Sequence, residues 1–173
     1  TPMRSSAASD VYKRQVLPYF SGERTPIHDP KARGAIFGLD LTHNRGDIFR
    51  AFLEGIAMGT AQVFETYEAI GQKPRKVMAV GGGTKNNIWM QATSDFSKID
   101  QVVSEKSTGA SYGNAFLAAL AVGAVSQRDI TRWNPALSKI KTQHSALHAE
   151  KNKLFRQLYE SSKEIAHAVA DSA

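Results

Sequence analysis

The sequence predicts an α/β fold, and three observations support this class. Residues 77–96 begin with four apolar residues, continue with three consecutive glycines, and then place apolar residues at helical spacing, which is typical of a strand, a turn and a helix. A long amphipathic stretch precedes this segment at 46–70, and a second one follows it at 149–169. Short apolar runs at 16–20, 34–37 and 100–103 predict further strands.

Composition restricts the function classes. The 173 residues are 42% hydrophobic and 22% charged, which indicates one globular domain with a real core. Cysteine is absent, and no apolar run approaches the ~20 residues that cross a bilayer, so we expect a cytoplasmic protein with no membrane partner. The net charge is +6, but the basic residues are scattered, so we expect no nucleic-acid partner.

Residues 1–15 differ from the rest of the chain. They show no periodicity and little apolar content, and the run DVYKRQ at 10–15 resembles the in-frame translation of a common sequencing adapter. We interpret residues 1–15 as an adapter-derived scar, so that the domain proper comprises residues 16–173.

Residues 16–38 are rich in proline and glycine, which limits regular structure to a brief strand at each end. The run SGERTP at 21–26 is polar and conformationally constrained, a combination typical of functional loops over a rigid scaffold. For Glu23 and Arg24 themselves we favour the alternative, that they form ion pairs holding the loop to its neighbours.

The stretch at 46–70 predicts a long helix capped by Thr42 or Asn44 and ended by Gly71. Gly55 and Gly59 lie inside it, where each costs up to ~1 kcal/mol of helix propensity, and we expect another helix to approach closely there. The predicted apolar face consists of Phe49, Phe52, Leu53, Ile56, Val63, Phe64, Tyr67 and Ile70.

The glycine turn after residues 77–80, a predicted buried strand, is the candidate functional site. Gly81, Gly82 and Gly83 leave bare backbone that a flat ligand can approach, and the following helix offers unpaired N–H groups. This chemistry suits a nucleotide, although a tight turn without a ligand explains the glycines as well. Their contiguous spacing matches neither the dinucleotide-binding fingerprint nor a P-loop.

The remainder of the chain predicts a second turn at 105–113 and a small-residue helix at 114–125, suited either to an interdomain position or to simple core packing. Residues 129–148 are expected to be irregular, with a break at Trp133, Asn134 and Pro135, before a last helix at 149–169. The five histidines form no ligand cluster, so no metal-binding residues are predicted.

Taken in order, five motifs resemble one family. SGERTP, ARGAIFGL, RAFLEGIA, VGGGTKNNIWMQATSD and TGASYGNAFLAALAVG are similar to the C-terminal half of the FGGY carbohydrate kinases, closest to the xylulokinase branch. The resemblance implies an actin-like (ribonuclease H-like) ATPase fold, of which this chain would be the C-terminal lobe only. The resemblance implies that the nucleotide is bound by Gly81, Gly82, Gly83 and Asn86. It also implies that the turn around Thr108, Gly109 and Ala110 belongs to a hinge helix.

The resemblance also implies the chemistry. Family members use ATP and Mg²⁺ to transfer the γ-phosphate to a sugar hydroxyl, with an aspartate base and sugar-binding residues that lie upstream of the GERTP motif. No catalytic residue is therefore predicted here: the sugar would bind through a missing N-terminal lobe, and the fragment alone would bind nucleotide weakly without turnover. Phe52 is bulkier than the family pattern expects.

One other reading stays open: the lobe could be a non-catalytic nucleotide-binding or interaction module of the same actin-like fold. A Rossmann-type dehydrogenase is disfavoured, because this sequence lacks the glycine spacing and the acidic ribose contact of that class. The oligomeric state is open too, with a homodimer as one candidate.

Overall fold

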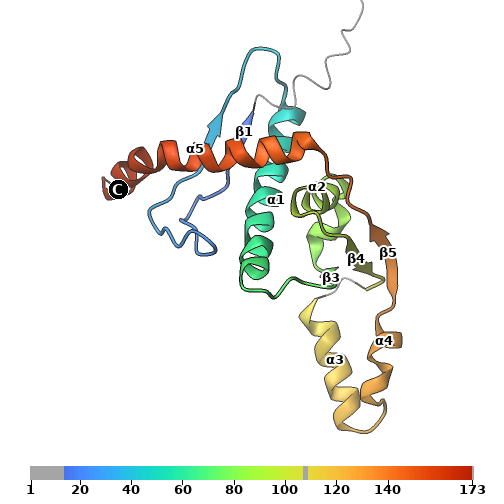
Figure 1. Cartoon of the computed structure of the whole chain (residues 1–173). Helices are drawn as coiled ribbons and strands as arrows, with labels where there is room; N and C mark the ends of the chain where they lie inside the picture. Colours follow the sequence, from blue (N-terminus) through green and yellow to red (C-terminus); the bar gives the residue numbers. More distant parts are fainter. Residues whose placement is uncertain (1–13, 107–108, 173) are drawn as a thin grey trace, which may run out of the picture.

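The computed structural model describes residues 14–106 and 109–172. In chain order the elements are β1 (Gln15–Leu17), β2 (Ala35–Phe37), α1 (Arg45–Ala69), β3 (Val77–Ala79), η1 (Gly82–Lys85), α2 (Asn87–Ser97), β4 (Gln101–Ser104), α3 (Ala110–Ala121), η2 (Gln127–Asp129), α4 (Ile130–Trp133), β5 (Ala136–Ile140) and α5 (Ala146–Asp171). Helix α5 crosses α1 near one end of the molecule, and α3 with α4 forms a hairpin that projects from the other end (Figure 1). The predicted α/β class is confirmed.

The strands form two separate sheets. Strand β1 pairs with β2 in antiparallel fashion, while β4 lies between β3, which is parallel to it, and the antiparallel β5. The prediction that residues 77–80 form a buried strand is wrong, because β3 has one strand neighbour in the described structure and Met78 is 46% exposed. Strand β5 lies in a segment predicted to be irregular.

The core lies where β1, α1, α2 and α5 meet. Tyr19 packs edge-on against Phe155 and Tyr159, with ring centroids 6.0 and 5.8 Å apart. A Cβ at Gly55 would lie 2.4 Å from the carbonyl oxygen of Val16, so Gly55 lets α1 approach strand β1 rather than another helix. A Cβ at Gly59 would meet no atom of the described residues within 4 Å, so the close approach predicted at Gly59 is not found among them.

Helix α1 begins with a complete capping box. The side chain of Asn44 accepts the N–H groups of Gly46 and Asp47, and the Asp47 carboxylate accepts the N–H of Asn44. The predicted apolar face is wrong in part, because Phe49, Tyr67 and Ile70 are exposed. The buried face instead carries mainly small residues and two polar ones: Ala51, Leu53, Glu54, Gly55, Ala57, Met58, Ala61 and Gln62.

Helix α5 holds two other parts of the chain. Near its start, Lys151 is buried and forms an ion pair with Glu54 of α1. Further along, Tyr159 donates to the carboxylate of Asp29 at 2.8 Å, and Nε2 of His167 lies 2.8 Å from the same oxygen. Burial raises the pKa of Asp29, but these hydrogen bonds and the backbone N–H of Lys31 outweigh it and bring the pKa to about 2.

The ion pairs favoured for the SGERTP loop are not present in the described structure. The Glu23 carboxylate accepts the backbone N–H groups of Arg24 and Thr25, and neither Glu23 nor Arg24 has an ion-pair partner among the described residues. Instead, backbone hydrogen bonds between Glu23 and Asp29 close the loop, and α5 holds it through Asp29.

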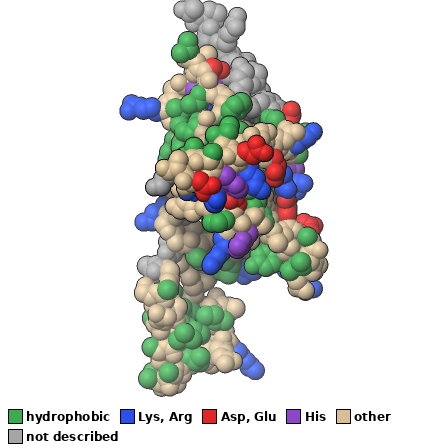
Figure 2. Space-filling model, turned by 90° about the vertical axis from the view of Figure 1, so that its left-hand side faces the viewer, with side chains coloured by type: hydrophobic (Ala, Val, Ile, Leu, Met, Phe, Trp, Pro, Cys, Tyr) green, Lys and Arg blue, Asp and Glu red, His purple; other side chains and the backbone are tan. Residues whose placement is uncertain are grey.

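Helix α3 starts and ends four residues before its predicted bounds, because the chain turns at Gly109 with φ of 71° and at Gly123 with φ of 74°. Phe116 is the only buried residue of α3, so simple core packing does not explain its small residues. Figure 2 shows apolar side chains over the projecting end of the molecule, and Leu117 and Val122 of the α3 region are exposed.

The predicted domain start at residue 16 falls inside strand β1, which begins at Gln15. Arg14 is 5% exposed and its guanidinium donates to the carbonyl and the carboxylate of Asp47 at 3.0 and 3.1 Å. Residues 1–13 lie outside the described residues, and the origin of segment 1–15 stays a prediction. No helix in the described ranges is long and apolar enough to span a bilayer.

Candidate functional site

The candidate site lies at the carboxyl ends of two parallel strands. Val77 of β3 pairs with Gln101 of β4, and the register continues to Ala79 and Val103. Because the strands are parallel and adjacent, the segments that follow them leave the sheet at the same edge. In open α/β sheets this edge is where ligands bind.

The segment after β3 is a tight turn that needs glycine at its first position. Gly81 has φ of 92°, a left-handed conformation that residues with a Cβ rarely adopt. Its carbonyl accepts the backbone N–H of Thr84 at 3.2 Å and the Thr84 hydroxyl at 2.7 Å, so the turn closes on itself. The chain then enters η1 and reaches α2 at Asn87.

The next two glycines differ in what covers them. Gly82 is exposed, and a Cβ placed on it would meet no atom within 4 Å. At Gly83 a Cβ would lie 2.8 Å from the ring of Trp89, so that glycine accommodates the indole of α2. Of the three predicted binding glycines, Gly81 and Gly82 therefore form the open backbone surface, and Gly83 is explained by internal packing.

Asn86 is the N-cap of α2. Its side-chain oxygen accepts the N–H of Trp89 at 3.1 Å, and its own N–H donates to the carbonyl of Gly83. The side-chain NH₂ group of Asn86 has no hydrogen-bond partner among the described residues and is its free donor for the predicted contact with a nucleotide, while the oxygen has one lone pair occupied by the Trp89 N–H.

The segment after β4 forms the opposite wall. Lys106, Gly109 and Ala110 border a cavity of about 600 Å³ that Val80 closes on the β3 side. Helix α3 starts there without a side-chain cap on its N-terminal N–H groups. Thr108, which the resemblance places in this turn, lies outside the described residues.

The far wall of the cavity was not expected from the sequence. It is formed by Tyr112 and Phe116 of α3 together with Trp133 and Asn134, all of which line the cavity. The sequence marked residues 133–135 only as a break in an irregular segment. A tryptophan followed by an asparagine and a proline was the available signal, but its partners are more than twenty residues away.

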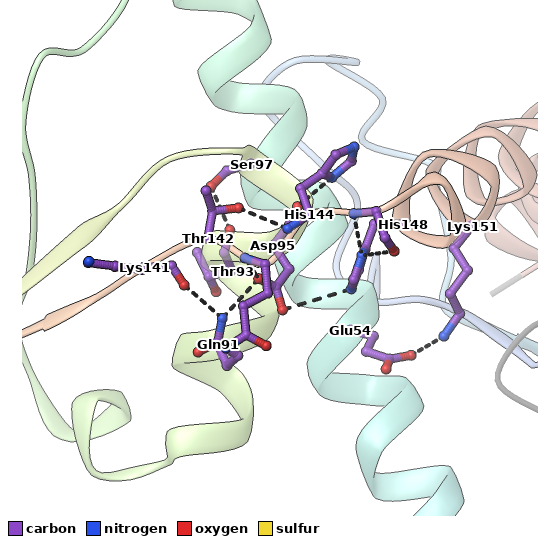
Figure 3. Close-up of polar contacts among 12 residues, drawn as sticks. Glu54, Gln91, Thr93, Asp95, Ser97, Lys141, Thr142, His144, His148 and Lys151 are labelled. Carbon is purple, nitrogen blue, oxygen red and sulfur yellow. Dashed lines mark hydrogen bonds and ion pairs between the residues drawn. The ribbon is translucent and has the colours of Figure 1, made fainter. Parts of the chain in front are cut away.

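A second polar cluster, around Asp95, serves to join elements (Figure 3). The Asp95 carboxylate accepts the side chain of Gln91 at 2.9 Å and the backbone N–H of Gln143 at 2.6 Å. Burial lowers the pKa of the nearby His148 and so favours the neutral imidazole. The Asp95 carboxylate acts in the opposite direction and raises this pKa, but its effect is smaller. The cluster attaches α2 to the start of α5, and we assign it a structural role although a cavity of about 350 Å³ adjoins it.

None of Asp29, Asp40, Asp47 and Asp95 borders the 600 Å³ cavity, and the sequence predicts no catalytic base among them. Asp29 is held by α5, Asp47 belongs to the capping box, and Asp40 accepts the hydroxyl and N–H of Thr42. With Asp95 in its structural cluster, the described residues place no general base in the candidate site.

The cavity walls do not fit a protein-bound Mg²⁺ ion. Mg²⁺ prefers carboxylate oxygens, water and phosphates, and the lining residues include no carboxylate. In the described ranges no group of three or more His, Cys, Asp or Glu side chains is arranged to hold a metal. A magnesium ion would therefore be held chiefly by nucleotide phosphates and by groups outside this chain.

The fold and this crevice define the chain as an α/β lobe with a ligand-sized cavity at the carboxyl edge of parallel strands. The chain belongs to the FGGY family of carbohydrate kinases: the family model of their C-terminal domain matches residues 3–122. The resemblance drawn from the five motifs is thus confirmed.

Individual relatives agree with this assignment. The chain is 37% identical over 106 residues to a xylulose kinase of Bacillus subtilis, covering 61% of this chain and 21% of the relative. A xylulose kinase structure from Rhodospirillum rubrum superposes with a TM-score of 0.76 at 27% identity, over 92% of this chain and 32% of that one. Plasmodium falciparum glycerol kinase with ADP gives a TM-score of 0.73 at 25% identity, over 93% and 32%.

These matches confirm the predicted fold class and the likeness to xylulokinases. The chain spans about a fifth of the length of the curated relatives it matches, 21% in the Bacillus subtilis case. The relatives are kinases, which favours the kinase interpretation over a non-catalytic module of the same fold.

Proposed function

We propose that this chain is the ATP-binding lobe of an ATP-dependent carbohydrate kinase of the xylulokinase type. The observation that carries the proposal is the open backbone of Gly81 and Gly82. These glycines directly follow Val80, which lines a cavity of about 600 Å³, although Gly81, Gly82, Gly83 and Asn86 do not line it themselves. The adenosine end of ATP would rest on this backbone, and the NH₂ group of Asn86 would donate to it. The apolar walls suit a base, and the backbone suits close approach.

The lobe would contribute binding and orientation. In phosphoryl transfer the protein mainly positions the reactants and stabilises charge. Lys85 and Lys106, on the two sides of the turn region, would attract the anionic phosphates. When bound with ATP, Mg²⁺ would neutralise phosphate charge. The general base and the sugar-binding residues would come from a lobe outside this chain.

The proposed acceptor is a pentulose or a related polyol. The xylulose kinases among the relatives support a pentulose, while a glycerol kinase of Pasteurella multocida is also 41% identical over 111 residues. We propose a cytoplasmic setting, with no nucleic-acid or membrane partner and with a homodimer as one form of the parent enzyme.

The test is to titrate ATP against the purified chain and follow amide NMR signals. A chain of 18.9 kDa is small enough for amide NMR, and we expect saturable shifts at Gly81 and Gly82 with weak affinity. Incubation with ATP and xylulose should give no sugar phosphate. Absence of saturable shifts near the turn would refute the site, and phosphorylated sugar would contradict the assignment of the base to another lobe.

A further inference from the structure

Asn134 extends a β ladder with its side chain. Beyond the paired strands β4 and β5, the N–H of Glu105 donates to the carbonyl of Pro135 at 3.0 Å. One residue further, Asn134 Oδ1 accepts the N–H of Lys106 and Nδ2 donates to the Lys106 carbonyl, both at 2.9 Å. A carboxamide carries the same donor and acceptor as a peptide group, so Asn134 continues the pairing where Pro135 has no N–H to give.

Trp133 makes a matching pair of bonds to the first turn of α3. The hydroxyl of Tyr112 donates to the Trp133 carbonyl at 2.9 Å, and the indole N–H of Trp133 donates to the Tyr112 carbonyl at 3.3 Å. The indole also contacts Phe116, with ring centroids 5.4 Å apart. Since Phe116 is the only buried residue of α3, this contact is the main apolar anchor of the helix.

These bonds reach the residues that border the cavity. Lys106, held by Asn134, and Gly109 and Ala110, one turn or less from Tyr112, form the wall opposite Val80. Helix α3 projects from the rest of the molecule (Figure 1), so its first turn depends on local bonds for its position. Trp133 and Asn134 therefore hold the segment after β4 and the first turn of α3, both of which border the cavity.

We propose that Asn134 and Trp133 are positioning residues of the nucleotide site, which fix the α3 side of the cavity against the glycine turn. The proposal rests on the function proposed above, because it concerns how well the same cavity receives the adenosine end of ATP. Neither side chain needs to donate to the ligand. Their effect is to keep Lys106 and the first turn of α3 in place before ATP arrives.

The direct test compares ATP affinity in Asn134→Ala with wild type. Two hydrogen bonds to Lys106 are lost, and we expect binding about tenfold weaker at a nearly unchanged melting temperature. Asn134→Asp keeps the acceptor for the Lys106 N–H but loses the donor, and should be intermediate. Gln127→Ala is the control, because Gln127 is an exposed residue of the same hairpin and should bind ATP as wild type does. Equal affinity in Asn134→Ala and wild type would overturn the proposal.

A second measurement avoids reliance on how Asn134→Ala folds. The chain has two tryptophans, Trp89 and Trp133, so Trp133 is the only one left in a Trp89→Phe variant. The emission of Trp133 should change on ATP addition, and the midpoint should match the dissociation constant that NMR gives for the same Trp89→Phe variant. Unchanged emission at saturating ATP would refute the placement of ATP in this cavity beside Trp133.

The two proposals fail in different ways. If Gly82→Val weakens ATP binding while Asn134→Ala does not, the glycine turn remains a nucleotide site and only the positioning role is lost. If neither variant changes the affinity, both proposals are wrong.

Discussion

Replacing Gly82 by valine tests whether the glycine turn is a binding surface. A Cβ at this position meets no atom within 4 Å, and the residue lies outside the left-handed region. The substitution should therefore change the free energy of unfolding by no more than about 0.5 kcal/mol. Any loss of ATP affinity then reports on the ligand and not on the fold.

The expected loss follows from contact geometry. Carbon atoms in favourable contact lie about 3.5–4.0 Å apart, and a gap of 0.5–1 Å forfeits a quarter to a half of the contact energy. The valine side chain would lift a base lying on the Gly82 backbone by at least that gap. We expect the binding free energy of ATP to fall by about 1.4–2.8 kcal/mol, which is a ten- to hundredfold larger dissociation constant.

The assay is ATP titration by NMR or calorimetry on the wild type and three variants: Gly82→Val, Gly59→Val and Gly83→Val. Gly59→Val is the matched control, because Gly59 also has open space around its Cβ but lies in α1, away from the cavity. Gly83→Val, in contrast, should lower the stability of the fold, since its Cβ would push against Trp89. Equal affinity for wild type and Gly82→Val, with both folded, would refute the reasoning.

Three further predictions concern stability. Gly55→Ala brings a methyl group to 2.4 Å from a strand carbonyl and should lower the melting temperature, whereas Gly59→Ala has open space and should raise the free energy of unfolding by up to about 1 kcal/mol; equal effects in thermal melts would contradict this. Glu54→Gln leaves the buried ammonium of Lys151 without its carboxylate and should cost about 3 kcal/mol in urea denaturation, and a loss below about 1 kcal/mol would count against a buried pair. Since the pKa of Asp29 is lowered from 3.8 to about 2, its stabilising contribution is present above about pH 4 and is lost as the pH falls toward 2. Asp29→Asn should flatten the melting temperature over that range, and a profile parallel to wild type would disprove the role of Asp29.

The part of the site predicted from sequence is the part made by local interactions. The order of apolar strand, Gly81 turn and helix is encoded within about twenty residues, and the periodicity of α2 identified it. The capping of α1 by Asn44 and its end near Gly71 have the same local origin. The motif order then identified the family, which no single element could do.

What sequence reasoning missed depends on distant contacts. The helical spacing of residues 87–97 places Trp89 on a helix face, but its position over Gly83 appears only once η1 and α2 are folded. The approach of Gly55 to the Val16 carbonyl joins segments almost forty residues apart. Strand β5 is mostly exposed and lacks apolar alternation, so its pairing with β4 left no pattern to detect.

The start of α3 at Ala110 could not be predicted from the sequence for a different reason. It is set by the left-handed conformation of Gly109, and a glycine in the sequence does not reveal the sign of its φ angle. The amide of Asn134 likewise could not be paired with Lys106 before β4 and β5 were placed side by side.

Within residues 14–106 and 109–172, strand β3 pairs on one side only, which has a practical consequence for handling the protein. A strand with an unpaired edge can template addition of a strand from another molecule, and the apolar surface of Met78 and Val80 would add to such aggregation. A ligand that binds only the native lobe opposes this, because binding draws the population toward the folded monomer. Purification and storage with millimolar ATP should therefore keep more of the chain monodisperse in light scattering than buffer alone.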